Sequence, residues 1–252
     1  MSAYSYQLYS SRNFQPLATT LAMLKETGYA AVEGYAGVFD NLDEFARELG
    51  AAHLKMPSAH LSIDALEQDQ AGTLAIVEKL NVETVYCPYL AEPDRPIDAA
   101  GYRALGERLQ HAGQFLVNAG IGFGWHNHDF EFQPLPDGST PMDHIFAGGP
   151  DLEWEADIAW IARGGADPFE WIEKEKRRIT AVHLKDLAPE GQLVDEDGWA
   201  DLGQGTLAWT ELLVALADAP VRYWIVEHDN PSDERRFAER SMAFLNSTAQ
   251  SS

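Results

Sequence analysis

The stretch GFGWHNHDFEF, residues 122–132, begins as an apolar segment and ends in two histidines and a glutamate. A buried strand gains nothing in packing by closing on His126, His128 and Glu131, because buried ionisable groups cost free energy unless they are paired. The same form, a short apolar run that ends in ionisable residues, recurs along the chain. The spacing of these runs, and the pattern between them, decides the fold.

Eight short β-rich segments are predicted, and a stretch with helical periodicity follows most of them. The segments are 4–10, 30–35, 56–62, 83–89, 120–128, 152–157, 179–186 and 221–229. PLATTLAMLKETG, for example, has leucines at three- and four-residue steps and a closing glycine. The helical patterns cover 16–28, 41–51, 69–81, 102–120, 167–178, 206–219 and 232–247. Apolar strands that alternate with amphipathic helices indicate a parallel sheet.

Eight strand–helix units in 252 residues predict an α/β fold, a (β/α)8 TIM barrel that forms a single domain over residues 1–252. The small polar tail, from about 245 to 252, is expected to fray. An open doubly-wound sheet is the alternative. It would favour a glycine-rich phosphate-binding turn after the first strand, and SSRNFQP at 10–16 is not one.

The composition bears on partners and location. The chain has 40 acidic and 18 basic residues and a formal net charge of −22, and its one cationic cluster, KEKRR at 174–178, fits a solvated helix face. No nucleic-acid partner and no membrane partner is therefore expected. The single cysteine, Cys87, allows no internal disulfide and is expected to be a packed core thiol. No signal peptide or membrane span is visible, so a cytoplasmic location is expected.

Ionisable side chains gather at the predicted ends of six strands, and the active sites of TIM barrels lie at the carboxyl ends of their strands. These residues are Glu33, His60, His126, His128, Glu131, Asp157, His183, Lys185 and Glu227. Any one of them could be a satisfied structural residue. Their joint placement predicts a functional site at one mouth of the barrel.

Four of these residues form an oxygen-rich set with one imidazole: Glu131, Asp157, His183 and Glu227. Such ligands suit Mn²⁺ or Mg²⁺, with Co²⁺, Fe²⁺ or Zn²⁺ as further candidates, and they lack the thiolates of a structural zinc site. A metal held in this way can polarise a carbonyl and an adjacent hydroxyl together. It thereby acidifies the neighbouring C–H and stabilises an enediolate, while carboxylate or imidazole bases move the proton.

The chain resembles the sugar phosphate isomerase/epimerase family, the xylose isomerase-like TIM barrels, in segments that occur in family order. They are QLYSSR (7–12), SAH (58–60), HNHDFEF (126–132), EADIAW (155–160), HLKD (183–186), DLGQGTLAW (201–209) and VEHD (226–229). HNHDFEF and HLKD together make the resemblance strong. It implies a divalent metal held by residues of strands 5 to 8, among which Asp157, His183 and Glu227 match the ligands of the family. It also implies isomerisation, epimerisation or related enolisation chemistry on sugars or cyclitols.

The fifth strand leaves its ligand open. Many relatives carry a glutamate at the end of that strand, where this chain has His126. The resemblance then implies that Glu131 reaches the metal from beyond the strand, while His126 and His128 face the substrate as acid/base or hydroxyl-binding groups. Alternation places both histidines on one side of the strand. The alternative is that His126 itself binds the metal.

The remaining candidates also have two interpretations each. Lys185 is expected to bind a substrate oxygen or stabilise an enolate, or instead to pair with Asp186 or another acid. Glu33 and His60 are expected to line the sugar pocket or to support the metal ligands. Arg163 is expected to bind an anionic or hydroxyl group, or to form a salt bridge in its loop. The catalytic groups are expected among His126, His128, Lys185, Glu131 and Glu227.

The leading hypothesis for function is a divalent-metal-dependent isomerase or epimerase of a keto sugar or related polyol. A keto-sugar or inosose dehydratase, or hydratase, could use the same site, because the two histidines supply an acid for a leaving hydroxyl. A non-catalytic accessory subunit is a minor alternative, and the net charge of −22 opposes a DNA-cleaving phosphodiesterase. Basic residues are scarce at the strand ends, which favours a substrate without phosphate. The oligomeric state is open, with a homo-oligomer such as a dimer as the common default.

Overall fold

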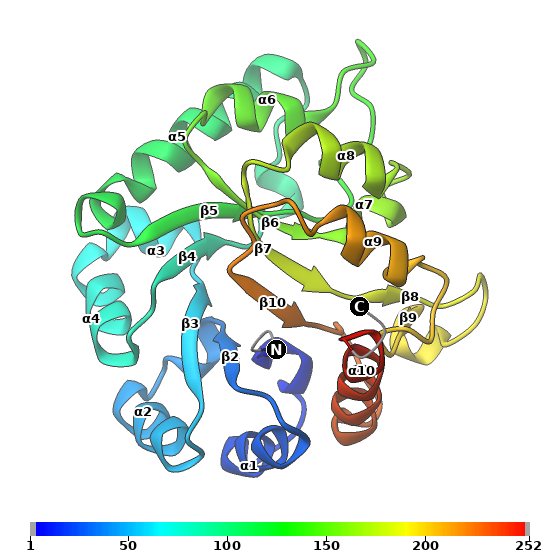
Figure 1. The fold of residues 1–252 in the computed structure, drawn as a ribbon. Coiled ribbons are helices and arrows are strands. Elements are labelled where there is room, and N and C mark those ends of the chain that lie inside the picture. Colours follow the sequence, from blue (N-terminus) through cyan, green and yellow to red (C-terminus); the bar gives the residue numbers. More distant parts are fainter. Residues whose placement is uncertain (1–3, 250–252) are drawn as a thin grey trace.

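A closed barrel of parallel strands forms the centre of the molecule in the computed structural model, which describes residues 4–249 (Figure 1). Around the barrel the strands are β1 (Tyr4–Gln7), β2 (Ala31–Gly34), β3 (Lys55–His60), β4 (Thr84–Cys87), β5 (Gly122–His126), β6 (Glu153–Asp157), β7 (Ile179–Leu184) and β10 (Tyr223–Val226). The last of them, β10, closes the barrel by pairing with β1. Each predicted β-rich segment supplies one of these strands, so the TIM-barrel prediction is confirmed.

Helices cover the outside of the barrel (Figure 1). They are α1 (Leu17–Thr27), α2 (Leu42–Ala51), α3 (Ile63–Gln68), α4 (Gln70–Leu80), α5 (Ala99–Asn118), α6 (Pro141–Gly148), α7 (Ile158–Arg163), α8 (Pro168–Glu175), α9 (Trp209–Ala215) and α10 (Glu234–Ala249). All seven predicted helical stretches contain a helix. The helices α3, α6 and α7, of six to eight residues each, were not predicted.

The C-terminal helix differs from the prediction for the tail. Fraying was expected from about residue 245, but α10 continues to Ala249. Leu245 is fully buried, so its packing holds this last part of the helix against the barrel. Residues 250–252 of the predicted tail lie outside the described residues.

The core lies between the strands and the helices. Every residue of β4 is buried, as expected for a parallel strand that is covered on both faces. Cys87 ends this strand as a buried free thiol, and burial raises its pKa to about 12. The prediction of a packed core cysteine is therefore confirmed.

A small hairpin extends the chain beyond β7. It pairs β8 (Asp186–Leu187) with β9 (Trp199–Ala200) in antiparallel fashion. The Asp186 carboxylate accepts hydrogen bonds from backbone N–H groups at four positions: Leu187, Gly203, Gly205 and Leu207. A side chain at Gly205 would collide with this carboxylate, which explains the glycine there. The GQG turn at 203–205 is thus organised by Asp186.

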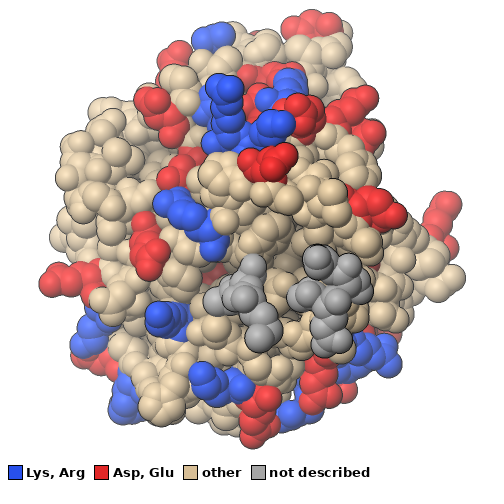
Figure 2. Space-filling model, in the orientation of Figure 1, with Lys and Arg blue, Asp and Glu red and all other residues tan. Residues whose placement is uncertain are grey.

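Charged side chains of both signs are interspersed on the face shown in Figure 2. The KEKRR cluster follows this pattern, because Lys174 pairs with Asp143, and Lys176 and Arg178 pair with glutamates of their own segment. This agrees with a solvated helix face. No helix between residues 4 and 249 is long and apolar enough to cross a membrane.

Candidate active site

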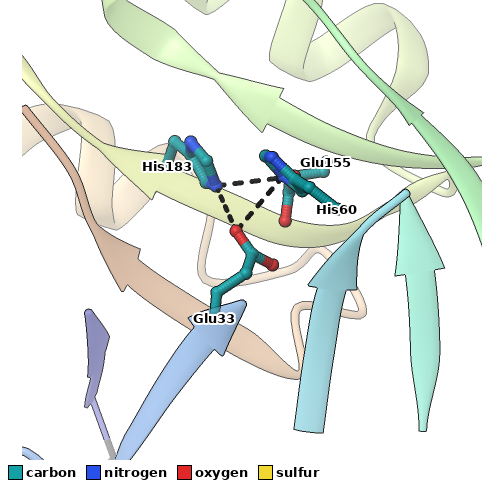
Figure 3. Close-up of side chains that lie close together, drawn as sticks. All are labelled: Glu33, His60, Glu155 and His183. Carbon is teal, nitrogen blue, oxygen red and sulfur yellow. Dashed lines mark hydrogen bonds and ion pairs between the residues drawn. The ribbon is translucent and has the colours of Figure 1, made fainter. Parts of the chain in front are cut away.

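Among residues 4–249, two groups of potential metal ligands lie inside the barrel, and in each group the ligand atoms are within 4.8 Å of one another. The mouth group consists of residues from the carboxyl ends of four neighbouring strands: His126, Asp157, His183 and Glu227. The inner group, drawn in Figure 3, consists of Glu33, His60, Glu155 and His183. All of these side chains are buried. His183 belongs to both groups.

Asp157 takes part in two structures at once. It is the last residue of β6 and the N-cap of α7, where its Oδ1 accepts a hydrogen bond of 2.9 Å from the backbone N–H of Trp160. Its Oδ2 lies 3.7 Å from His126 Nε2 in the mouth group. The helix cap thus fixes the carboxylate and leaves one oxygen for a ligand.

Asn127 joins the ends of β5 and β6. Its side-chain Nδ2 donates to the Asp157 carbonyl, and its Oδ1 accepts from the Asp157 N–H, both at 3.0 Å. The same oxygen accepts from Trp154 Nε1 at 2.8 Å. The asparagine between the two histidines of HNH therefore sets the position of Asp157 relative to His126.

His183 stands between the two groups and turns one ring nitrogen to each. Its Nδ1 is 2.8 Å from Glu227 Oε2 and 3.2 Å from His126 Nε2. Its Nε2 is 2.8 Å from Glu33 Oε2 (Figure 3). Burial on its own lowers the pKa of His183, but Glu155 and Glu227 raise it well above the ordinary value. A cation bound at Nδ1 would take the place of that proton.

Lys185 is fully buried among carboxylates beside the mouth group. Its Nζ donates to Glu227 Oε2 at 2.9 Å and to Asp229 Oδ1 at 2.8 Å, and it lies 3.3 Å from Asp157 Oδ2. Burial lowers the pKa of Lys185, but these three acids raise it above its ordinary value. Lys185 therefore remains an ammonium, and its partners are these acids rather than Asp186.

Glu131 lies apart from both groups. Its Oε1 accepts from Trp125 Nε1 at 3.0 Å, and its Oε2 accepts from the backbone N–H of His128 at 2.9 Å. Burial raises the pKa of its carboxyl to about 8. The structure does not bring Glu131 to Asp157 and His183, as the first expectation for the strand-5 ligand required. The residue that joins them is His126, which was the alternative.

His128 lies farther out than His126 and is half-buried. Its ring centroid is 5.0 Å from those of His126 and Tyr89 and 5.1 Å from that of Trp160. Burial lowers the pKa of His128 well below the ordinary value. The ring is thus a neutral imidazole at the entrance of the mouth group.

The three residues expected to contact the substrate lie outside the mouth group. Glu33 and His60 belong to the inner group, where Glu33 has no exposed surface. Arg163 donates from Nη2 to the Asp197 carbonyl, and its guanidinium lies 3.4 Å from the centroid of the Trp199 ring. It lines a cavity of about 650 Å³ together with residues of the segment 187–206. A substrate contact by any of the three stays a prediction.

Two acidic residues of the site escaped the sequence analysis, Glu155 and Asp229. Glu155 lies two positions before Asp157 on β6, so strand alternation alone places both on the inward face. That signal could have found it. Asp229 follows Glu227 by two residues, and its side chain, 21% exposed, reaches Lys185. Burial raises the pKa of Asp229 to about 6.

The mouth group offers two imidazoles and two carboxylates to one point. This donor set fits a divalent transition metal such as Zn²⁺, Mn²⁺, Co²⁺ or Fe²⁺. It fits Mg²⁺ less well, because Mg²⁺ prefers oxygen ligands and retains water.

Comparisons with known proteins agree with this architecture. The sequence model of the family described as xylose isomerase-like TIM barrel matches residues 21–248. A sugar phosphate isomerase/epimerase from Parabacteroides distasonis superposes with a TM-score of 0.80 at 20% identity, over 96% of this chain and 92% of its own. A probable 3-DHS dehydratase from Bacillus anthracis gives 0.75 at 14% identity, over 98% and 99% of the two chains.

A third solved structure, that of the IolI protein with a bound zinc atom, superposes with a TM-score of 0.74 at 15% identity, over 99% of this chain and 97% of its own. The comparison with curated protein sequences gives no significant match. At these identities the solved structures establish the shared fold, and the family model establishes the lineage of the sequence.

Proposed function

The chain belongs to the xylose isomerase-like TIM barrel family, and from this premise we propose that it is a divalent-metal-dependent isomerase or epimerase of a keto sugar or related polyol, acting through an enediolate. The observation that carries the proposal is the convergence of four buried ligand atoms of the mouth group. A cation held there by His126, Asp157, His183 and Glu227 would polarise a substrate carbonyl and its neighbouring hydroxyl. The donor set favours Mn²⁺, Zn²⁺, Co²⁺ or Fe²⁺.

Lys185 supplies a fixed positive charge next to the mouth group. Its ammonium forms ion pairs with Asp157, Glu227 and Asp229. It also lies beside two tryptophan rings, with Nζ 4.5 Å from the ring centroid of Trp199. A preorganised cation in a buried setting stabilises negative charge that develops on a substrate oxygen. Lys185 is therefore assigned to the substrate oxygen and not to proton abstraction, because its pKa is raised.

Two groups at the entrance can carry protons. His128 is a neutral imidazole, since burial lowers its pKa, and it can take a proton from a substrate carbon. Asp229, with a pKa of about 6, can exchange protons near neutral pH. Both are only partly buried, whereas the ligands beneath them are enclosed. An isomerase or epimerase needs such groups to remove a proton and return it elsewhere.

A keto-sugar or inosose dehydratase is the second candidate, and the same pair of groups favours it. One of the two could remove the proton from carbon while the other protonates the departing hydroxyl. The family premise fits both reactions, because one site chemistry can serve several substrates on one fold.

The proposal is tested with protein that has been loaded with Mn²⁺ and incubated in D₂O with keto sugars and inososes. We expect deuterium to enter the carbon next to the carbonyl, and NMR of the products then separates an epimer or aldose from a dehydrated product. Asp157→Asn is the matched control, which should lose both metal and exchange. Wild-type protein that binds metal but exchanges no carbon-bound proton in any substrate would refute enolisation chemistry. Protein that takes up no metal would refute the metal centre.

A further inference from the structure

Three residues of the inner group, Glu33, His60 and Glu155, have no role in the proposed reaction. Glu33 and Glu155 are fully buried within the barrel. Within residues 4–249, the ion pairs of both carboxylates are with the imidazoles of His60 and His183, and no lysine or arginine reaches them. Buried carboxylates are costly unless a cation pairs with them, and in this cluster only a protonated imidazole or a bound cation can do so.

Each of these two carboxylates also has an oxygen without a partner. In the described part of the chain, Glu33 Oε1 and Glu155 Oε1 are buried and accept no hydrogen bond. Figure 3 shows them as the two oxygens that no dashed line reaches. A buried charged acceptor that makes no bond loses its hydration without compensation. Two such atoms in one cluster indicate that the cluster is built for a cationic ligand.

We propose that the inner group binds a second divalent cation, held by Glu33, His60 and Glu155. The His60 Nε2 atom is the point of convergence, because it lies 2.5 Å from Glu155 Oε2 and 3.3 Å from Glu33 Oε2. The shorter distance is one across a shared proton, which a cation would displace as the ligands settle at about 2.0–2.2 Å from the metal. One imidazole and two carboxylates suit Zn²⁺, Mn²⁺ or Co²⁺.

His183 lies between the two sites. With Nδ1 on a cation of the mouth group, the ring proton is at Nε2 and donates to Glu33 Oε2, which is 2.8 Å away. His183, a ligand of the first cation, is thereby hydrogen-bonded to Glu33, a ligand of the second. Glu155 precedes Asp157 by two residues on β6, which is about 7 Å along a strand. The two cations would thus be stacked, one beneath the other.

The charge of the barrel interior supports two cations. In the described part of the chain, the two groups and their surroundings contain five acidic side chains and one ammonium, that of Lys185, which pairs with only three of them. The acids are Glu33, Glu155, Asp157, Glu227 and Asp229. When the histidines are neutral, one divalent cation in the mouth group leaves the interior negative, and a second cation balances it.

The strand β6 offers a matched series of variants, since Glu153, Glu155 and Asp157 occupy alternate positions on it. Each protein is stripped with a chelator, reloaded in parallel with Mn²⁺ or Zn²⁺, freed of unbound ions by gel filtration and subjected to elemental analysis. We expect about two ions per chain in wild type and in Glu153→Gln, and about one in Glu155→Gln and in Asp157→Asn. His60→Gln should also bind about one ion, and it replaces Glu155→Gln if that variant fails to fold by circular dichroism.

The inference rests on the proposed function only in that both cations depend on His183. The variants distinguish a failure of the second site from a failure of the mouth site. If wild type binds one ion of either metal, lost in Asp157→Asn and kept in Glu155→Gln, the second site is overturned and the mouth site stands. The inner group would then be held together by protons on its histidines. If wild type and Glu155→Gln bind equally, the second site is likewise overturned. A wild type that binds no ion overturns both.

Discussion

At the end of β5, His126 joins the mouth group while Glu131 lies behind it in the following loop. Both oxygens of Glu131 accept N–H bonds, from Trp125 and from His128, and burial raises the pKa of its carboxyl to about 8. A metal ligand must be deprotonated and free to turn towards the ion. The contacts of Glu131 hold the loop that carries His128, and under the proposed function His126 binds the metal.

The different roles of Glu131 and His126 give a prediction. His126→Asn should weaken the binding of Mn²⁺ by about 10- to 100-fold or more, because loss of a ligand costs at least as much as loss of its supporting partner. Glu131→Gln should keep the metal but lower the free energy of unfolding by about 1–2 kcal/mol, since an amide accepts at only one of the two positions. Metal titration and urea denaturation measure the two effects. The opposite pattern would restore Glu131 as the ligand.

His128 allows a prediction about pH. Its pKa is lowered by burial, so the ring is neutral at neutral pH and becomes protonated only as the pH falls below the ordinary histidine range near about 6.5. The acid limb that His128 contributes to kcat/KM should therefore lie below about pH 6.5. His128→Gln should retain the metal and lose about 10²- to 10⁴-fold in kcat. Unchanged turnover in this variant would make the residue structural.

The hairpin formed by β8 and β9 depends on a single side chain. The Asp186 carboxylate collects four backbone N–H groups and so holds the turn at 203–207 against β8. An amide at this position would turn its NH₂ group towards some of those donors. The element is thus stabilised by local hydrogen bonds and not by a long ladder, because each strand has only two residues.

Asp186→Asn should accordingly lower the free energy of unfolding by about 2 kcal/mol, the cost of unsatisfied buried hydrogen-bonding groups. Chemical denaturation of the two proteins measures it. Asp218→Asn, at an exposed position after α9, is the matched control and should change stability by less than about 0.5 kcal/mol. A variant of Asp186 as stable as that control would show that the hairpin is held by other contacts.

At the level of elements, the strands could be predicted as short apolar runs and the long helices from their hydrophobic period. The short helix α7 could not, since its N-cap, Asp157, reads in the sequence as a strand end. Glu155 was overlooked for a related reason. A glutamate in a strand is usually solvated, and only the knowledge that its face points inward reveals a buried carboxylate.

Across the whole molecule, the order of the strand ends predicted that the ionisable residues would meet, because the carboxyl ends of all barrel strands share one face. The sequence could not separate the mouth group from the inner group. That division depends on the ring of His183 and on which nitrogen faces which acids. It could not place Arg163 either, whose guanidinium is held by Trp199, a residue that is remote in sequence.

Bound metal should contribute to the stability of the whole barrel. One cation at 100 times its dissociation constant adds about 2.7 kcal/mol to the free energy of unfolding. For a domain of this size, that raises the unfolding temperature by about 5–10 °C. Chelation should reverse the gain, because the free energy of cation binding to the folded state is then lost, and calorimetry with and without chelator measures it. The unfolding temperature of Asp157→Asn should change less on chelation. An unchanged unfolding temperature of the wild type would contradict a metal bound at micromolar levels.

Because β10 closes the barrel against β1, a nascent chain cannot complete the mouth group before residue 227 has left the ribosome. Until then β1 and β7 present unpaired edges, and only three of the four ligands exist. A metal at the proposed site would therefore be captured only late in biosynthesis. A translation product that stops short of β10 would keep unpaired strand edges and bind no metal, and proteases would degrade it readily.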